Sequence, residues 1–397
     1  MTVLTSKPAV NIRSELADLK KPTGIAGEAM LRAETIVEQA TLLGIAPKNI
    51  LKNGAIAIDQ RGAFAGVSVS GTSGSDTIIG FGPDRFKLYM SETFTTLDAT
   101  IRQTADGPSG FSTCLEIETI TVETAAANGD LYAIQHMIEG FDVQGLGWGT
   151  SEAKPVTLQF WVKSNAPGTY PISMYMAEGG GDQVNFTYTI EQSEVWQQIV
   201  WVIPGNFAAA PANDNTVGLT INMAFAAGAT YKGGGSQPNW GAYANNKWAN
   251  GIEVDLGAID GNYFRMTGVQ LTKGSFPEGV PFEHKSISDD LRDCQRYFYR
   301  PTTAGDLTGN THAQAFNSSG VIGSFVYKET MRAAPAIVSF SIGNGTAGQI
   351  RKTSDGATTS SAGATNIGLN SFGFVTGMSG LTTGDAYDLT FTADAEL

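Results

Sequence analysis

Apolar residues follow two different spacings in this chain, and the spacing changes after residue 48. In the first segment Ile12, Leu16 and Leu19 have helical spacing, and residues 26–43 are rich in Ala, Glu and Leu. A Pro-Thr-Gly break separates these two stretches. The pattern predicts two short helices in an N-terminal arm, residues 1–48, which is too short to bury a core by itself.

From residue 49 onward, apolar and polar positions alternate with a period of two. Residues 50–58 predict an opening strand, and a run rich in Gly, Ser and Thr over 66–82 predicts a long loop. Short alternating segments separated by turn residues indicate a β-sandwich, which we assign to residues 49–283. The further predicted strands lie at 113–122, 133–138, 156–163, 169–176, 185–190, 197–203, 217–225 and 263–271.

Two segments follow the predicted sandwich. Ser286 to Asp289 offers hydroxyls and a carboxylate to a helix N-terminus, which predicts a short linking helix within residues 284–300. Beyond it, alternating residues predict a small β-domain over residues 301–397. Residues 343–368 of that domain are almost all small or polar, too poor in apolar mass to form a core alone. The predicted strands of this domain lie at 323–327, 336–342, 372–376 and 386–393.

Composition and charge narrow the class of protein. The chain has 397 residues, with 48 Gly, 15 Pro and only 16% charged residues, which favours turn-rich β structure over helices. Its net charge of −13 disfavours binding to nucleic acid or to an anionic membrane. No apolar run approaches the roughly 18 residues of a membrane span, and residues 1–8 lack the apolar run of a secretory signal, so we expect synthesis in the cytosol.

Residues that usually perform catalysis are sparse and scattered. His136, His284 and His312 are not at metal-ligand spacing, and the chain has no Gly-x-Ser-x-Gly elbow and no phosphate-binding loop. Cys114 and Cys294 lie far apart in sequence, which predicts two buried thiols rather than a disulfide framework. We therefore expect no catalytic residue, no metal and no cofactor.

Paired carboxylates keep one enzymatic alternative open, because a glycosidase needs only two acidic side chains that folding brings together. The candidate pairs are Glu178 with Asp182, in a glycine-rich stretch, and Glu253 with Asp255, whose spacing predicts one face of a strand. Solvated surface carboxylates are the simpler interpretation of all four residues.

Aromatic residues suggest binding instead. Residues 231–248 combine Trp240, Tyr243 and Trp248 with Gly, Asn and Gln, a composition typical of adaptable binding loops. We predict that these three side chains contact a glycan or a protein; the alternative is a structural cap over one end of the sandwich. The tryptophans at 161, 196 and 201 are predicted to lie in the core, because the strand containing the first is nearly continuously apolar.

Several phrases of this sequence resemble one family. They are Trp161-Val162-Lys163-Ser164, Gly268-Val269-Gln270-Leu271, Pro281-Phe282-Glu283-His284-Lys285-Ser286 and Cys294-Gln295-Arg296-Tyr297-Phe298-Tyr299-Arg300. In their order they resemble the tail fibres and minor virion structural proteins of tailed bacteriophages, which carry a jelly roll like that of carbohydrate-binding modules. The resemblance extends over nearly the whole chain. It implies a mostly β fold: a jelly-roll β-sandwich preceded by a short helical N-terminal arm and followed by a small C-terminal β-domain.

The same resemblance implies a function. The expected protein is a non-enzymatic virion component, made in the host cytoplasm and anchored to other virion proteins through Ile12, Leu16 and Leu19 of its arm. Its β-domains would attach to a host surface glycan or protein, and a homotrimer is expected because thin β-domains bury more surface when shared. Related jelly rolls often bind calcium through adjacent aspartates in the last strand, but Thr267 and Gly268 occupy those positions here. The alternatives are a lectin-like glycan-binding module, a capsid fibre or decoration protein, and a polysaccharide depolymerase.

Overall fold

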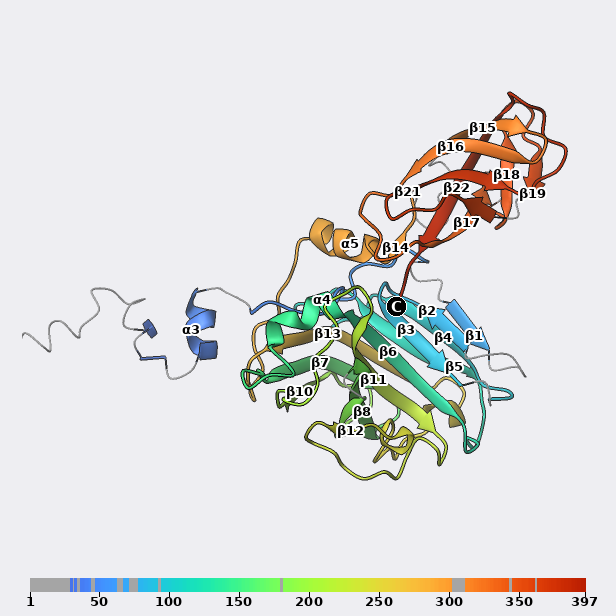
Figure 1. The fold of residues 1–397 in the computed structure, drawn as a ribbon. Coiled ribbons are helices and arrows are strands. Elements are labelled where there is room, and N and C mark those ends of the chain that lie inside the picture. The colour runs from blue at the N-terminus through green and yellow to red at the C-terminus, as the bar shows by residue number, and fades with distance from the viewer. Residues whose placement is uncertain are drawn as a thin grey trace, which may run out of the picture.

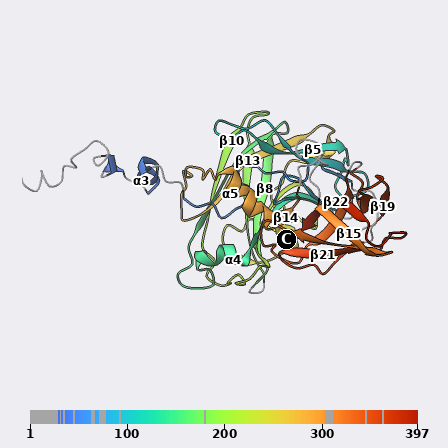
Figure 2. The same ribbon diagram turned by 90° about the horizontal axis from the view of Figure 1, so that it is seen from above.

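Three antiparallel sheets make up most of the chain (Figure 1). The computed structural model describes residues 29–30, 32–33, 36–43, 47–62, 67–70, 78–91, 94–178, 181–301, 311–342, 345–360 and 363–397. Two sheets, A and B, pack face to face as a β-sandwich. Sheet C forms a distal domain that lies outside the sandwich and joins it at one end (Figures 1 and 2).

The chain crosses repeatedly between the two sheets of the sandwich, with one or two successive strands in a sheet before each crossing, as in a jelly roll. In order across sheet A, the strands are β1 (Val67–Ser70), β4 (Asp98–Thr104), β5 (Cys114–Thr121), β13 (Tyr263–Lys273), β7 (Val156–Ser164) and β10 (Gln197–Ile203). Across sheet B they are β12 (Gly241–Ala242), β9 (Asp182–Ile190), β8 (Gly168–Met176), β11 (Val217–Ala227), β6 (Leu131–Glu139), β3 (Phe86–Met90) and β2 (Ile78–Phe81).

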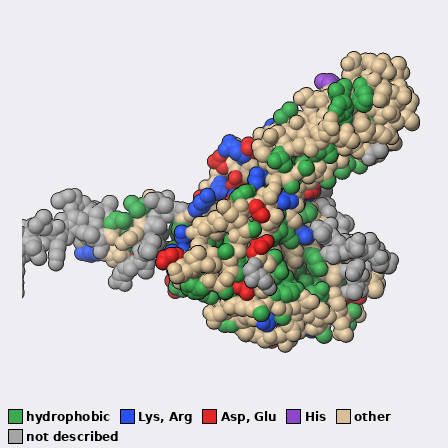
Figure 3. Space-filling model, viewed as in Figure 1, with side chains coloured by type: hydrophobic (Ala, Val, Ile, Leu, Met, Phe, Trp, Pro, Cys, Tyr) green, Lys and Arg blue, Asp and Glu red, His purple; other side chains and the backbone are tan. Residues whose placement is uncertain are grey.

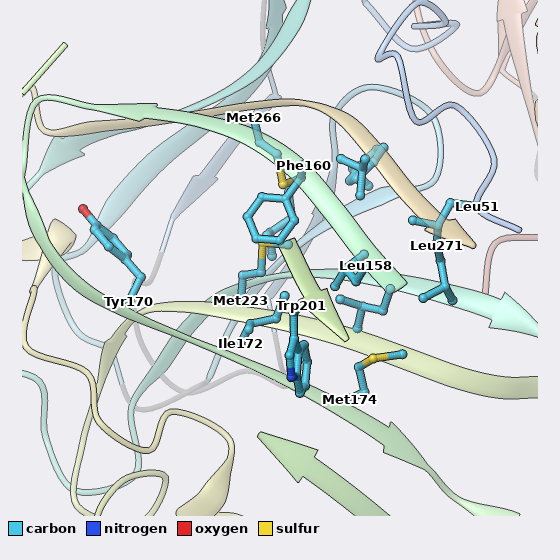
Figure 4. Packing of buried hydrophobic residues seen from close by; sticks show 14 of the residues in the cluster. Leu51, Leu158, Phe160, Tyr170, Ile172, Met174, Trp201, Met223, Met266 and Leu271 are labelled. Carbon is cyan, nitrogen blue, oxygen red and sulfur yellow. The ribbon is translucent and has the colours of Figure 1, made fainter. Parts of the chain in front are cut away.

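The core of the sandwich fills the space between sheets A and B (Figure 4). Alternate residues of β7, such as Leu158 and Phe160, point inward and meet Ile172 and Met174 of β8. Trp201 of β10 lies in the same layer, and its ring stacks on Phe186 with centroids 5.3 Å apart. Each large side chain that is fully buried here stabilises the fold by about 1.5–3 kcal/mol.

The distal domain has its own smaller core, built from Phe325, Phe372 and Phe391, whose rings contact one another. Across sheet C the strands are β19 (Thr358–Ser360), β18 (Gln349–Lys352), β22 (Ala386–Asp394), β15 (Thr311–Asn317), β16 (Gly320–Val326), β21 (Ser371–Thr376) and β20 (Gly363–Thr365), with β14 (Phe298–Tyr299) and β17 (Ala336–Ser341) also paired to β22. Strands β18, β19 and β20 lie within residues 343–368, the stretch too poor in apolar residues to form a core alone. Strand β18 pairs with β22 and β19, and β20 pairs with β21.

The predicted strands from residue 113 to 271 are confirmed, each to within a few residues of its predicted ends. Strand β4 was not predicted. The loop predicted over 66–82 is wrong in part, because β1 and β2 lie inside it, while residues 71–77 lie outside the described ranges.

The opening strand predicted over 50–58 is wrong. This segment is a buried coil in which Asn53 and Ile56 adopt left-handed backbone angles, with φ of 56° and 54°. The Asn49 side chain replaces a neighbouring strand, since its Oδ1 accepts from Leu271 N at 2.9 Å and its Nδ2 donates to Val269 O at 2.9 Å. Leu51, Ile56 and Ile58 are buried. The backbone is satisfied partly by the side-chain amides of Asn49 and Asn53 and partly by single backbone bonds to β13, so no continuous ladder forms.

The core prediction holds for Trp201 but is wrong for Trp161 and Trp196, which are half-buried. Trp161 lies on the outer face of sheet A, opposite Thr267. Gly268 has a φ of +63° at the bulge that follows, and a Cβ there would come within 2.8 Å of the Phe111 ring. In β7 the polar residues Thr157, Gln159 and Lys163 alternate with the buried ones and mark the outward face on which Trp161 lies.

The described helices are few and short. Helix α5 (Ile287–Gln295) starts where predicted, and the Ser286 hydroxyl caps it by accepting from Asp289 N at 3.2 Å. In the arm, helix α3 (Ile36–Leu43) is described, whereas Ile12, Leu16 and Leu19 lie outside the described residues. No helix in the described part of the chain is long and apolar enough to cross a membrane.

Candidate functional site

An aromatic cluster lies on the outer face of sheet B. Tyr175 points outward from β8, between the inward-facing Met174 and Met176, and it meets two rings from the loop that follows β11. Its ring centroid lies 4.9 Å from that of Tyr243 and 5.5 Å from that of Trp248. Tyr243 and Trp248 are themselves 6.0 Å apart. These three residues are called the aromatic patch.

The polar atoms of the aromatic patch are arranged by short-range contacts. Trp248 Nε1 donates to the Tyr243 hydroxyl at 3.1 Å, and that hydroxyl contacts Asn245 Oδ1. Burial raises the pKa of Tyr175, and the neighbouring Tyr243 raises it further. The Tyr175 hydroxyl therefore stays neutral at physiological pH. Tyr243 remains 39% exposed, so its ring is open to a ligand.

The loop that carries the patch is fixed to the sheet through Asn185 of β9. The Asn185 backbone N–H donates to Gln237 O at 2.9 Å, and its side-chain oxygen accepts from Gln237 N at 2.9 Å. Further along the loop, Ser173 of β8 donates to Trp248 O at 3.3 Å. The loop is therefore held at two places on a rigid sheet, which fixes the ring positions before any ligand arrives.

Trp240, the third predicted contact, lies apart from the aromatic patch. Its Nε1 donates to Pro204 O at 2.8 Å, and its ring meets Trp148 edge-on with centroids 5.1 Å apart. It packs against the sandwich core, as expected for a structural cap. The structure thus brings Tyr243 and Trp248 together, leaves Trp240 elsewhere, and adds Tyr175. The outward position of Tyr175 in the alternation of β8 was a signal that the sequence contained.

One member of each acidic pair has a structural partner. Asp182 accepts from Asn206 Nδ2 at 2.8 Å, while Glu178 is exposed. Asp255 caps the short helix η4 (Leu256–Ala258) by accepting from Gly257 N at 3.1 Å, and burial raises its pKa. Glu253 and Asp255 lie outside any strand, so their predicted common strand face is wrong. Among the residues described, no group of three His, Cys, Asp or Glu could hold a metal ion.

A second cluster, buried and charged, lies where the distal domain meets the sandwich. Arg85 and Glu396 form an ion pair with side chains only 2% and 3% exposed. Arg61 contacts Glu396 at 3.3 Å, Asp394 at 3.2 Å and the fully buried Asp84 at 3.6 Å. These five residues are called the joint. These contacts fix Asp394 and Glu396 to the sandwich, although Arg61 and Arg85 lie more than 300 positions earlier in the sequence.

The joint also has an aromatic wall. The guanidinium of Arg85 lies 3.5 Å from the centroid of the Tyr297 ring, and that of Arg61 lies 3.7 Å from that of Phe298. Arg85 adopts a left-handed backbone with a φ of +74°, a costly conformation for a residue with a Cβ. Burial raises the pKa of Asp84 to about 7, against the opposing charge of Arg61.

Two of the phrases that carry the family resemblance, residues 281–286 and 294–300, lie between the sandwich and the distal domain. Arg296 makes a two-pronged contact with Glu139 of β6, at 2.7 and 2.8 Å. Cys294 is fully buried, and Glu283 accepts from Asn49 N at 2.5 Å. The residues of these two phrases therefore connect the sandwich to the distal domain.

Comparison with known proteins finds no matching protein-family model and no matching curated protein. Solved structures with similarity include the enzymatically active domain of bacteriophage CBA120 tailspike protein 4, at 12% identity and a TM-score of 0.28, over 57% of this chain and 21% of that chain. The family 11 carbohydrate-binding module of the cellulosomal cellulase Lic26A-Cel5E of Clostridium thermocellum matches at 11% identity and a TM-score of 0.26, over 56% of this chain and 99% of that chain. TmCBM61 in complex with β-1,4-galactotriose matches at 8% identity and a TM-score of 0.26, over 57% of this chain and 99% of that chain. The match spans about a fifth of the tailspike chain. All three TM-scores lie below 0.5, so the activities and ligands of these proteins are not transferred to this chain.

Proposed function

We propose that this chain is a non-enzymatic attachment subunit of a tailed-bacteriophage particle, and that its aromatic patch binds a glycan of the host surface. The observation that carries the binding proposal is the patch itself, three rings from two separate segments held on one rigid face. Tyrosine and tryptophan offer wide apolar faces at little cost in side-chain entropy, and the neighbouring Asn245 supplies a polar group. The virion part of the proposal rests on the family resemblance of the sequence.

The binding proposal is tested by Trp248→Ala and Tyr243→Ala, with Trp196→Ala as the matched control. Trp196 is also half-buried but precedes β10 of the opposite sheet. Loss of a central aromatic contact typically costs about 2 kcal/mol, which corresponds to a roughly 30-fold weaker affinity. We expect both patch variants to lose binding on a glycan array and adsorption to host cells, while the control keeps both. Unchanged binding by folded patch variants would refute the proposal.

The arm supplies the expected anchor to the particle, through Ile12, Leu16 and Leu19. Deletion of residues 1–48 should abolish incorporation into virions while leaving glycan binding intact, because the patch belongs to the sandwich. Normal incorporation of the truncated chain would remove the arm from this role. Absence of the full chain from every particle would instead favour the lectin-like alternative.

A depolymerase is the competing enzymatic function. It has little support from the candidate carboxylates, because Asp182 and Asp255 are engaged by Asn206 and by the η4 cap. A polysaccharide turnover assay separates the two functions: product release by the purified chain would overturn the non-enzymatic proposal.

A further inference from the structure

The distal domain has an apolar outer face on β15, β16 and β21. In these strands Ala315, Val321 and Val375 point into the core, and their neighbours Phe316, Ile322 and Phe374 point outward. The outward set includes Phe316 and Ile322, which are 42% and 44% exposed, and Val326, which is 59% exposed. Figure 3 shows hydrophobic side chains gathered over β15 and β16, at the end of the domain away from the sandwich.

Strand register makes this face continuous. Ile322 of β16 lies opposite Phe374 of β21, and the Phe374 ring meets Phe316 of β15 edge-on with centroids 5.5 Å apart. The Phe316 ring lies over Gly320, where a Cβ would come within 2.6 Å of it. Phe316, Ile322 and Phe374 thus form a contiguous surface, and together with the exposed Val326 at the other end of β16 they are called the apolar face. Such exposed surfaces usually mark a contact with another molecule.

The charge distribution identifies the kind of partner. Strands β15, β16 and β21 contain no Asp, Glu, Lys or Arg, although the chain as a whole carries a net charge of −13. In a symmetric interface a residue near the axis meets its own copy, so any charge there faces a like charge. Two copies of this acidic chain therefore approach at low electrostatic cost through these strands, in which the one ionisable side chain, His312, is already paired with Asp388 of β22 at 2.6 Å.

We propose that copies of this chain associate with one another through the apolar face of the distal domain. The inference deepens the proposed function, since a fibre subunit acts as an assembly of identical chains. It assigns self-association to β15, β16 and β21, and it leaves the sandwich face that carries the aromatic patch free for the host.

The test is the association state of the full chain, measured by light scattering and by sedimentation over a range of concentrations. Ile322→Lys and Val326→Lys each place a charge on the apolar face, and both side chains are exposed enough to be replaced without cavity formation. Val338→Lys is the matched control, because Val338 is 40% exposed but lies on β17. We expect an oligomer for the wild type and the control, and a single chain for both face variants with unchanged thermal unfolding of the monomer.

Two results would overturn the proposal. One is a wild-type chain that stays monomeric at the highest concentration tested, and the other is an oligomer that survives both face variants. Glycan binding by the monomeric variants separates this inference from the proposed function. Binding retained by a monomer supports the patch independently, whereas an intact oligomer that binds no glycan counts against the patch alone.

Discussion

The joint allows a quantitative prediction about how firmly the C-terminal segment holds the two domains together. Replacing Glu396 by Gln keeps the shape of the side chain and one acceptor oxygen but removes its charge. Arg61 retains Asp84 and Asp394, whereas Arg85 retains only the Met137 carbonyl and the ring of Tyr297. Breaking a buried ion pair by removing one partner costs about 3–5 kcal/mol. The aromatic contact of Arg85 and the remaining acceptor favour the lower end, about 3 kcal/mol.

Native-state hydrogen exchange measures this loss where it should occur. The Ala395 amide donates to Tyr297 O at 2.7 Å, so it exchanges only when the C-terminal segment opens. A loss of about 3 kcal/mol lowers its protection by a factor of about 100. The control is Glu152→Gln, which removes an exposed pair with Lys154 and should change protection by less than about fivefold.

The pairing itself is tested by a double variant. Adding Arg85→Met to Glu396→Gln removes the unpaired buried cation, so the double variant should regain part of the lost protection. Equal protection of Ala395 in the wild type and in Glu396→Gln would refute the reasoning, because the joint would then not hold the C-terminal segment.

Three further predictions concern stability. Burial raises the pKa of Asp84 from 3.8 to about 7, so between these two pH values the folded state binds a proton that the unfolded state releases. The free energy of unfolding therefore has its full contribution from Asp84 below about pH 4. It loses that contribution as the pH rises to about 7, by at most about 1.4 kcal/mol per pH unit. Urea unfolding of Asp84→Asn across this range should lack that slope, and an unchanged profile would contradict the assignment. Trp201→Ala should cost about 3–5 kcal/mol in chemical denaturation, and Trp161→Ala, on the outer face, clearly less; the reverse order would argue against the observed packing. Gly268→Ala should lower the melting temperature through about 1–3 kcal/mol of backbone strain and the clash with Phe111, and an unaltered melting temperature would count against the left-handed bulge.

Most strands of the sandwich were predictable because the alternation of a buried face with an open face is a local rule, although β1 and β2 lay in a predicted loop and β4, which alternates, was missed. That rule failed where a local pattern had two physical solutions. The segment around Asn53 has the apolar spacing of a strand, yet side-chain amides rather than a sheet satisfy its backbone. In β7 the polar residues Thr157, Gln159 and Lys163 place Trp161 on the outward face, so the core prediction for Trp161 was wrong because it followed the apolar content of the strand and not this alternation.

The candidate site was only partly predictable for a related reason. The composition of the 231–248 loop indicated Tyr243 and Trp248, but their partner Tyr175 lies in a strand about 70 residues away, and only folding brings it to them. The joint was missed because Arg85 and Glu396 lie 311 positions apart. A single buried charge is strongly unfavourable, so each of these residues considered alone would be expected at the surface. No local pattern in the sequence indicates that the two charges will be buried as a pair.

The joint connects the two domains that carry the aromatic patch and the apolar face. The aromatic patch includes Tyr175 of β8 in the sandwich, whereas the apolar face belongs to β15, β16 and β21 of the distal domain, and Figure 1 shows these strands on opposite sides of the boundary between the domains. If copies associate through the apolar face, the joint sets the distance and direction of every aromatic patch from the symmetry axis. Multivalent binding gains affinity only when the sites are held at separations that the target surface can match. A buried ionic cluster at the domain boundary supplies that rigidity, because moving the domains apart would separate the ion pairs and leave buried charges without partners.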